Sequence, residues 1–290
     1  NISESTFVRE RMVKVKAGTF KMGNTRNDSE GADDEKPVHT VTLTYDYYIG
    51  KYEVTFDEFD QFCEETGRQK PSDYSEWAGY NMGRGNKPVV NVTWYDAITF
   101  CNWLSEKEGL NVAYDNKGNF LDKNGNKTTD ITTVEGYRLP MEAEWEYAAR
   151  GGHKSSGDYK YAGSNDIDEV AWYWRNSGNS YLSGDWDGDK IKDNYNKTHE
   201  VGQKKPNELG IFDMSGNAWE MCQDYWDENY YEKSLKRNSW NFNSSSGRVG
   251  RGGSWGSNDS YCRVAYRDYW YEDGYCGSNV GFRLARTSSF

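Results

Sequence analysis

Regular segments in this chain are short, and long polar stretches rich in glycine, aspartate and asparagine separate them. Residues 12–16 and 41–45 alternate apolar and polar side chains, which predicts two strands. Three helices are expected to follow, without a strand–helix–strand alternation along the chain. The pattern therefore predicts an α+β fold of short strands with much irregular structure.

The expected helices have recognisable starts. Thr55-Phe-Asp-Glu58 is a capping box that predicts the first helix. Thr93 is the expected N-cap of the second. The third is predicted over residues 141–150, with Glu142 and Glu146 on its polar side. Because the chain is rich in carboxylates, most of them are interpreted as a solvated surface.

Turns and loops are marked just as clearly between these elements. Asp115-Asn-Lys-Gly118 and Asp122-Lys-Asn-Gly125 are tight-turn signatures, which predict one or two surface hairpins. Residues 176–200 are polar and are expected to form a long loop. Its segment Asp185-Trp-Asp-Gly-Asp189 resembles the start of an EF-hand. The position that should hold a bidentate Glu is Asn196, so a solvated loop is the preferred interpretation.

Large aromatic side chains compensate for a modest apolar content. Hydrophobic residues make up 35% of the 290 positions, but aromatic residues reach 16%, with 12 Trp and 23 Tyr. A disordered chain would be poor in such rings, so this chain is expected to fold. Buried rings supply the area that a loop-rich fold needs. The length permits one large domain or two smaller ones.

The net charge of −11 argues against general binding to nucleic acids or anionic membranes, because phosphate contacts require clustered Lys and Arg. No apolar run approaches the roughly 20 residues that span a bilayer. The chain starts without Met, which is compatible with a targeting segment that has been removed.

Five cysteines are scattered through the chain and form no CxxC pair. A zinc ribbon or thioredoxin motif is therefore not expected, and the spacing does not suggest a disulfide framework. The cysteines are interpreted as buried small hydrophobic residues, and they leave the cellular compartment undecided.

Eight sequence blocks occur in an order that resembles one known family. They are residues 17–23, 35–39, 48–55, 88–94, 137–145, 207–220, 251–255 and 281–286, including Tyr137-Arg-Leu-Pro-Met-Glu-Ala-Glu-Trp145 and Gly281-Phe-Arg-Leu-Ala-Arg286. The family is that of the sulfatase-modifying, formylglycine-generating enzymes. The resemblance implies a single domain over residues 1–290, with a C-type lectin core wrapped in irregular structure.

The resemblance also implies where an active site would lie. The enzymes use two copper-binding cysteines, five residues apart, after the Gly-Gly-Ser-aromatic block. Cys262 matches the second position, but Ser257 stands at the first, and Cys276 lies 14 residues beyond Cys262. One thiolate does not make a two-thiolate copper site. The chain is therefore predicted to have no catalytic residues and to bind no copper, with a copper-dependent oxidase retained as an alternative.

A family calcium loop is matched by the segment Asp213-Met-Ser-Gly-Asn-Ala-Trp-Glu220. The resemblance implies ligation by the side chains of Asp213 and Glu220 and by the backbone carbonyls of Gly216 and Ala218. Two carboxylates and several oxygen ligands suit Ca²⁺. A structural calcium is expected; the alternative is an Asp turn and a Glu that bind no metal.

The residue alphabet of residues 256–279 is unusual. Of 24 positions, 5 are Tyr, 3 Gly, 3 Ser, 3 Asp and 2 Asn, whereas Lys, Gln and Met are absent. These frequent residue types are reachable from an AAC codon by replacing adenines, although Trp270 and Glu272 are not. Such substitution is typical of diversity-generating retroelements. The segment thus resembles the variable region of their C-type lectin proteins, here expected within residues 251–286.

The same alphabet suits binding, since Tyr gives large contacts at low entropy cost and Ser, Gly and Asn give adaptable hydrogen bonds. The residues Cys262, Arg263, Val264 and Arg267 are expected to be fixed, with Arg251 and Arg283 holding carboxylates or carbonyls. The predicted ligand-binding residues are Ser257, Asn258, Ser260, Tyr261, Tyr266, Asp268, Tyr269, Tyr271, Asp273, Gly274, Tyr275, Cys276 and Ser278.

Three functions remain open at this stage. The preferred one is a diversified receptor outside the cell whose partner is a protein or glycan that differs between variants; the resemblance adds surface display, often through a lipid anchor. The others are a formylglycine-generating-type oxidase and a non-diversified accessory domain of the same fold.

Overall fold

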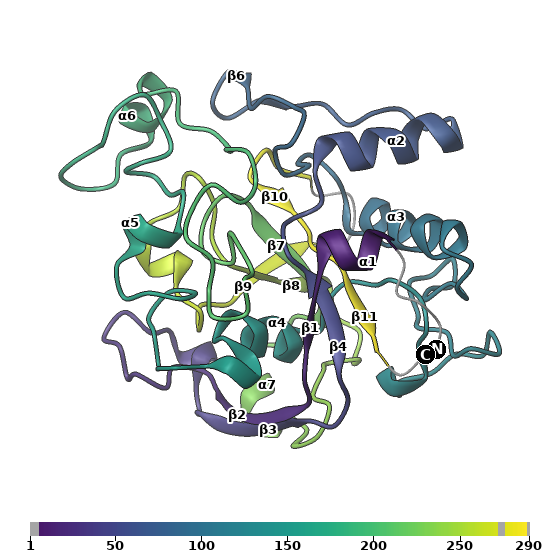
Figure 1. Ribbon diagram of the computed structural model, residues 1–290. Coiled ribbons are helices and arrows are strands. Elements are labelled where there is room, and N and C mark those ends of the chain that lie inside the picture. The colour runs from purple at the N-terminus through teal and green to yellow at the C-terminus, as the bar shows by residue number, and fades with distance from the viewer. Residues whose placement is uncertain (1–5, 272–275, 289–290) are drawn as a thin grey trace.

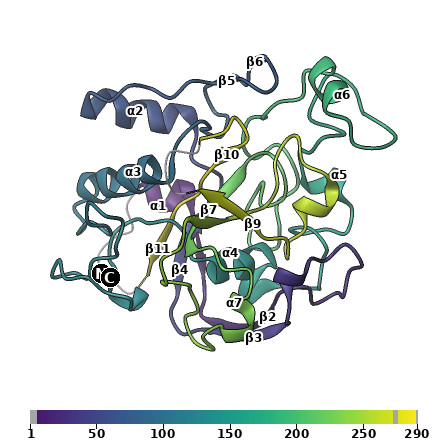
Figure 2. The same ribbon diagram turned by 180° about the vertical axis from the view of Figure 1, so that it is seen from behind.

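A computed structural model describes residues 6–271 and 276–288 of the chain. Its strands are short, as the sequence predicts, and they form four small sheets (Figures 1 and 2). The strands are β1 (Met12–Val15), β2 (Gly18–Met22), β3 (His39–Leu43), β4 (Tyr47–Gly50), β5 (Tyr74–Ser75), β6 (Tyr80–Asn81), β7 (Trp219–Tyr225), β8 (Gly247–Arg251), β9 (Asp268–Tyr271), β10 (Val280–Gly281) and β11 (Ala285–Thr287).

The α-helices are mostly brief as well. They are α1 (Thr6–Arg11), α2 (Phe56–Thr66), α3 (Trp94–Lys107), α4 (Glu142–Ala149), α5 (Ile167–Val170), α6 (Gly188–Asp193) and α7 (Tyr230–Lys233). Single 3₁₀ turns occupy Asp33–Glu35, Ile131–Thr133, Gly152–Lys154 and Asp259–Cys262. The capping box Thr55–Glu58 and the Thr93 cap are confirmed, since each hydroxyl accepts a hydrogen bond from the backbone N–H three residues later.

Two sheets organise the molecule. In one, β4 pairs antiparallel with both β1 and β11, so the first and last strands flank the same central strand. In the other, the order is β10-β7-β8-β9, with β10 parallel to β7 and the remaining pairs antiparallel. The predicted diversified segment thus includes β9 and leads directly into β10.

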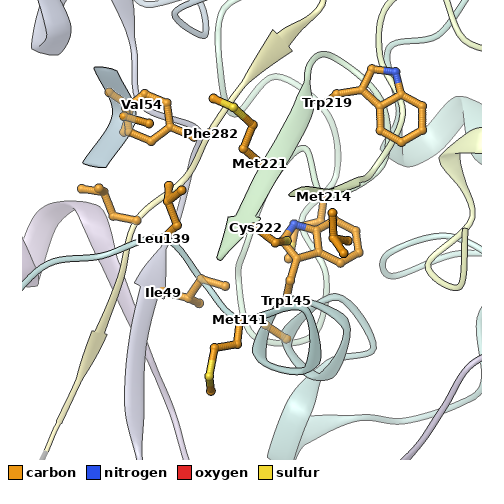
Figure 3. Packing of buried hydrophobic residues seen from close by; sticks show 14 of the residues in the cluster. Ile49, Val54, Leu139, Met141, Trp145, Met214, Trp219, Met221, Cys222 and Phe282 are labelled. Atoms are coloured by element: carbon orange, nitrogen blue, oxygen red, sulfur yellow. The ribbon is translucent and has the colours of Figure 1, made fainter. Parts of the chain in front are cut away.

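The core lies between these sheets and α4. Figure 3 shows Ile49 of β4, Trp145 of α4 and Cys222 of β7 directed toward this shared interior. On the other side, Phe59 and Phe100 bring α2 and α3 onto the core, with ring centroids 5.5 Å apart. Burial of such rings stabilises a fold that has little regular backbone structure.

Two expectations are changed by the packing. The helix α4 is buried all round, and Glu142, Glu144 and Glu146 are at most 1% exposed, so the idea of a solvated acidic side is wrong here. The 176–200 loop contains the short helix α6, whose N-cap Asp187 accepts from two backbone N–H groups. That capping role accounts for Asp187 within the acidic run that resembles an EF-hand start.

The tight turns at Asp115–Gly118 and Asp122–Gly125 are present. In each, the glycine has a positive φ and donates its N–H to the carbonyl of the aspartate. Among the described residues, no helix is long and apolar enough to cross a membrane.

Candidate ligand-binding cleft

Buried arginines anchor the diversified segment, our name for residues 256–279, which the sequence predicts to vary. Arg267 donates to both carboxylate oxygens of Glu142 at 2.6 and 3.0 Å, and Arg263 does the same with Glu35 at 2.6 and 2.8 Å. Arg251 pairs with Glu146. All of these side chains are buried, and the expectation that Arg251 holds a carboxylate is confirmed.

Electrostatics explains why these carboxylates tolerate burial. Removal from water acts to raise the pKa of Glu142, but Arg267 and Arg251 outweigh that effect and leave the pKa lowered. The bidentate geometry adds directional hydrogen bonds to the charge attraction. Glu142 lies 125 positions before Arg267, so these contacts tie α4 to the C-terminal segment.

The predicted ligand-binding residues fall into distinct environments. Tyr261 is 39% exposed. Cys276 is also exposed, whereas Asn258, Ser260, Tyr266, Asp268, Tyr269 and Ser278 are half-buried. Tyr271 belongs to β9 by its backbone, and its side chain is not described. Asp273, Gly274 and Tyr275 lie outside the described residues.

The tyrosines do not act as one surface. The Tyr261 and Tyr266 rings lie 4.7 Å apart, and Trp219 lies 5.9 Å from Tyr266 between centroids. Tyr269 contacts Trp226 at 6.0 Å and shares a hydrogen bond with Ser246. Tyr261 is therefore presented to solvent on an aromatic base, while Tyr266 and Tyr269 are partly used in packing.

A cleft of about 910 Å³ opens beside this segment. Six of the predicted residues line it: Ser257, Asn258, Tyr261, Asp268, Cys276 and Ser278. The other lining residues are Ser72, Tyr74, Glu76, Trp77, Asn91, Trp186, Trp219, Ser254, Trp255, Gly256, Gly277 and Asn279. A cleft of this volume can enclose one side of a ligand.

The wall of the cleft that faces the diversified segment was not predicted from the sequence. It comes from the β5–β6 hairpin and from the loop before α6, which project from the same end of the molecule as β10 (Figures 1 and 2). Trp186 donates its indole N–H to the carbonyl of Gly256 at 2.8 Å. The available sequence signal was a tryptophan within a polar, glycine-containing loop, but its destination depends on tertiary contacts.

Ser257 and Cys262, the positions that match the copper-binding cysteines of the enzymes, are both buried. Ser257 is 7% exposed, and its hydroxyl accepts from the backbone N–H of Ser254 at 2.9 Å. Burial raises the pKa of the Cys262 thiol, which favours the neutral form over the thiolate. A hydroxyl and one neutral thiol do not fit a thiolate copper centre.

The expected calcium loop fits an ion only in part. Both carboxylate oxygens of Glu220 accept from Arg283 at 2.5 Å, and one of them also accepts from Trp145. Asp213 accepts from the N–H of Gly202 with one oxygen, and its other oxygen has no hydrogen-bond partner. Within residues 6–271 and 276–288, no three acidic, imidazole or thiol side chains converge on a metal position.

A further buried acid, Glu53, was not anticipated. Neither of its carboxylate oxygens has a hydrogen-bond partner. Burial and then the nearby Asp213 raise the pKa of Glu53, and burial raises the pKa of Asp213 to about 6. When ionised, Glu53, Asp213 and Glu220 carry three negative charges against the one positive charge of Arg283. Ionisation of all three acids would leave this part of the core short of positive charge, and the raised pKa values of Glu53 and Asp213 follow from burial together with this repulsion.

Together, the two sheets, the extensive irregular structure and the arginine-anchored segment define a C-type-lectin-like fold of the formylglycine-generating-enzyme type. The chain belongs to the family of sulfatase-modifying factor enzyme 1-like domains, whose profile matches residues 2–288. Membership in this family does not decide the activity, because the relatives bear the names of enzymes, of a chaperone and of a variable protein.

Among sequence relatives, the chaperone protein LppX of Paenibacillus barcinonensis is 38% identical over 98% of this chain and 92% of its own length. The formylglycine-generating enzyme of Streptomyces coelicolor is 28% identical over 94% of this chain and 88% of its own length.

Among solved structures, Treponema denticola variable protein 1 matches with a TM-score of 0.71 and 33% identity, covering 95% of this chain and 94% of its own. PvdO from Pseudomonas aeruginosa matches with the same TM-score and 27% identity, over 95% of this chain and 94% of its own. The similarity to a variable protein agrees with the resemblance inferred from the sequence.

Proposed function

We propose that this chain is a ligand-binding variable protein of a diversity-generating retroelement, with its binding face on the diversified segment. The observation that carries the proposal is the division of labour within that segment. Arg263 and Arg267 anchor it through buried ion pairs, while Asn258 and Tyr261 open on the cleft. A rigid backbone with exchangeable side chains is what a diversified binding site requires.

A binding role without catalysis is supported by the chemistry at the enzyme positions. Ser257 replaces a soft ligand with a hydroxyl that is already hydrogen-bonded, and the Cys262 thiol is buried. An oxidase would require a thiolate pair at these positions. Stoichiometric Cu(I) binding together with oxygen consumption on a cysteine-containing peptide would contradict this part of the proposal.

The test of diversification is genetic. We expect the coding region of residues 251–286 to have a near-copy close by that differs at adenines, next to a reverse transcriptase gene. A coding region without such a copy or such a gene would favour the non-diversified accessory domain. We further propose display at the cell surface or outside the cell through a lipid anchor, which labelling of intact cells would test.

A chaperone is the second candidate, because the relative that is 38% identical bears that name. A cleft with several exposed aromatic rings suits transient binding of an unfolded polypeptide. If this candidate is correct, the protein should suppress aggregation of a partner enzyme during refolding. A diversified receptor should show no such effect with arbitrary unfolded proteins.

We also propose a structural calcium near Asp213. The negative charge excess around Glu53 and Asp213 supports a cation there, since Ca²⁺ would balance two buried carboxylates. Asp213 would contribute its free oxygen together with the backbone carbonyls of Gly216 and Ala218. Glu220 would lie near the ion without ligating it, because its carboxylate is already paired with Arg283.

A further inference from the structure

A second cavity lies outside the cleft, where α2 and α3 run side by side (Figures 1 and 2). Its volume is about 410 Å³, and it is bounded by the second half of α2, by residues 68–72 and by the start of α3. We name it the α2 pocket. None of its described lining residues belongs to the diversified segment, so the proposed function leaves it without a role.

The floor of the α2 pocket is apolar. Phe59, Phe62, Cys63 and Val92 line it, and each is at most 3% exposed. Burial raises the pKa of the Cys63 thiol, so the thiol is neutral and acts as a small apolar group. Two phenyl rings beside two small side chains suit a large apolar group of a ligand.

Two of the charged side chains in the lining already have partners. Lys70 pairs with Glu64 at 2.5 Å. Asp96 accepts the backbone N–H of Thr93 at 3.0 Å and its hydroxyl at 2.7 Å, as part of the cap of α3. Neither group is left uncompensated at the mouth of the pocket.

Arg68 differs from these two side chains. It lines the pocket and is exposed, and its side chain forms no ion pair or hydrogen bond with residues 6–271 or 276–288. Its guanidinium carbon lies 5.5 Å from the centroid of the Phe62 ring, within the range of a cation–π interaction. Arg68 therefore places an available positive charge at the edge of the apolar floor.

Asn91 stands where the α2 pocket meets the cleft, because Asn91 and Ser72 line both cavities. The side-chain amide of Asn91 donates to the carbonyls of Ser72 at 2.8 Å and Tyr74 at 3.0 Å. Its side-chain oxygen accepts no hydrogen bond from the part of the chain that the structure describes. That oxygen is available to a peptide N–H.

These three features together match the last residue of a polypeptide. Its carboxylate would pair with Arg68, its apolar side chain would cover the floor, and its backbone N–H would bond to Asn91. The residues before it would lead past Asn91 toward the cleft. A neutral glycan lacks the charge, and a phosphate lacks the apolar group.

We propose that the α2 pocket binds the C-terminal residue of a polypeptide that ends in a free carboxylate and a large apolar side chain. The inference goes beyond the proposed function, because no residue of the diversified segment takes part. A free aromatic acid shares the carboxylate and the ring but has no peptide N–H, so the experiment must separate it from a polypeptide terminus.

The experiment is an NMR titration of the isotope-labelled protein with acetyl-Gly-Gly-Phe. The peptide should shift the backbone amide signals of Arg68 and Gln69 and leave the indole signal of Trp186, in the cleft, unchanged. The C-terminal amide of the same peptide should bind about tenfold more weakly, because the charge-assisted hydrogen bonds to Arg68 are lost. Acetyl-Gly-Gly-Gly should also bind about tenfold more weakly, because it has no ring to bury.

A matched pair of variants isolates the role of Arg68. Arg68→Gln should weaken acetyl-Gly-Gly-Phe binding about tenfold and make the acid and its amide bind alike. Arg237 is also exposed but lines neither the α2 pocket nor the cleft, so Arg237→Gln should leave the affinity unchanged. Equal losses in the two variants would show attraction to positive charge in general and would overturn the proposal.

Other results would overturn it as well. These are equal binding of acid and amide, signal shifts centred on Trp186, and no binding of acetyl-Gly-Gly-Phe. If 3-phenylpropionate binds as tightly as the peptide, the pocket is a site for a free acid and the polypeptide terminus is excluded.

The outcome is separable from that of the proposed function. Absence of a template repeat would remove the diversification proposal and leave binding of acetyl-Gly-Gly-Phe as expected. Failure of this peptide to bind would end only the present inference, because the diversified segment lines the cleft and not the α2 pocket.

Discussion

At the scale of single residues, the buried ion pairs are the most sensitive features of this protein. Arg267 and Glu142 are both almost fully enclosed, and each loses its water when the chain folds. A buried pair adds little net stability compared with apolar packing, but removal of one partner leaves the other charge buried and uncompensated. Such residues tolerate little exchange, which is what the proposed diversification of the positions around them requires.

Arg267→Ala should therefore lower the free energy of unfolding by about 3–5 kcal/mol, measured by urea denaturation. The control is Lys36→Ala, because the Lys36–Asp33 pair is exposed and such pairs contribute about 0–1 kcal/mol. A loss in Arg267→Ala no larger than in the control would mean that Glu142 reaches water or another cation.

The buried acids near the calcium loop should make stability depend on pH in EDTA. The pKa of Asp213 is raised from 3.8 to about 6 in the folded chain, so its protonated form stabilises the fold. That stabilisation is complete below about pH 4 and is lost as the pH rises through about 6. Added Ca²⁺ should raise the melting temperature at pH 7.5 more than at pH 5.

Glu53→Gln provides the matching variant for this pH experiment. It removes a buried charge that lacks hydrogen bonds, so it should raise the melting temperature in EDTA at pH 7.5 and reduce the gain from Ca²⁺. A melting temperature that responds to neither pH nor Ca²⁺ would contradict both the charge excess and the calcium proposal.

At the scale of elements, the turn at Asp259–Cys262 and the strand β9 carry the side chains that we propose to be exchangeable. Cys262 is buried within this stretch, whereas Tyr261 beside it is exposed. Neighbouring positions thus differ sharply in what a substitution costs. Exposed changes usually alter stability by about 0.5 kcal/mol or less, while loss of a buried ring costs about 3–5 kcal/mol.

The triple variant Asn258→Ser/Ser260→Asn/Tyr261→Asn should change ligand choice and leave the melting temperature within a few degrees of the parent. Trp219→Ala, beneath Tyr266, should lower the free energy of unfolding by about 3–5 kcal/mol. Thermal scans and display selection measure the two effects. A large stability loss in the triple variant would place these side chains in the core.

At the scale of the whole molecule, the chain closes on itself. β1 and β11 pair with opposite edges of β4, and Arg138 exchanges backbone hydrogen bonds with Ala285. The diversified segment is therefore held on both sides, by β8 before it and by β10 and β11 after it.

Deletion of residues 285–290 should abolish the cooperative unfolding transition, because it exposes the edge of β4 and opens the core beside Ile49. As a control, two glycines inserted into the exposed turn at Asp122–Gly125 should be tolerated. Circular dichroism during heating distinguishes the outcomes. A deletion variant that still melts cooperatively would show that β11 is dispensable.

Local patterns in the sequence determined much of the architecture. The capping boxes at Thr55 and Thr93, the tight turns and the short alternating strands depend on neighbours within a few positions, so they can be read directly. The ordered blocks indicated the family, and the residue alphabet of the diversified segment suggested its role. The pairing of Arg251 and Arg283 with carboxylates or carbonyls was also anticipated, and both residues stand inside those blocks.

Only the tertiary structure decided which polar side chains are buried against protein and which face water. In the sequence, Glu142 and Glu146 look like a solvated helix face. In the structure they pair with Arg267 and Arg251, which lie more than 100 positions away in the chain. In the same way, Trp186 becomes part of a cleft only because its loop packs against Gly256. Burial and pairing depend on partners distant in sequence, and no local pattern encodes which partner will arrive.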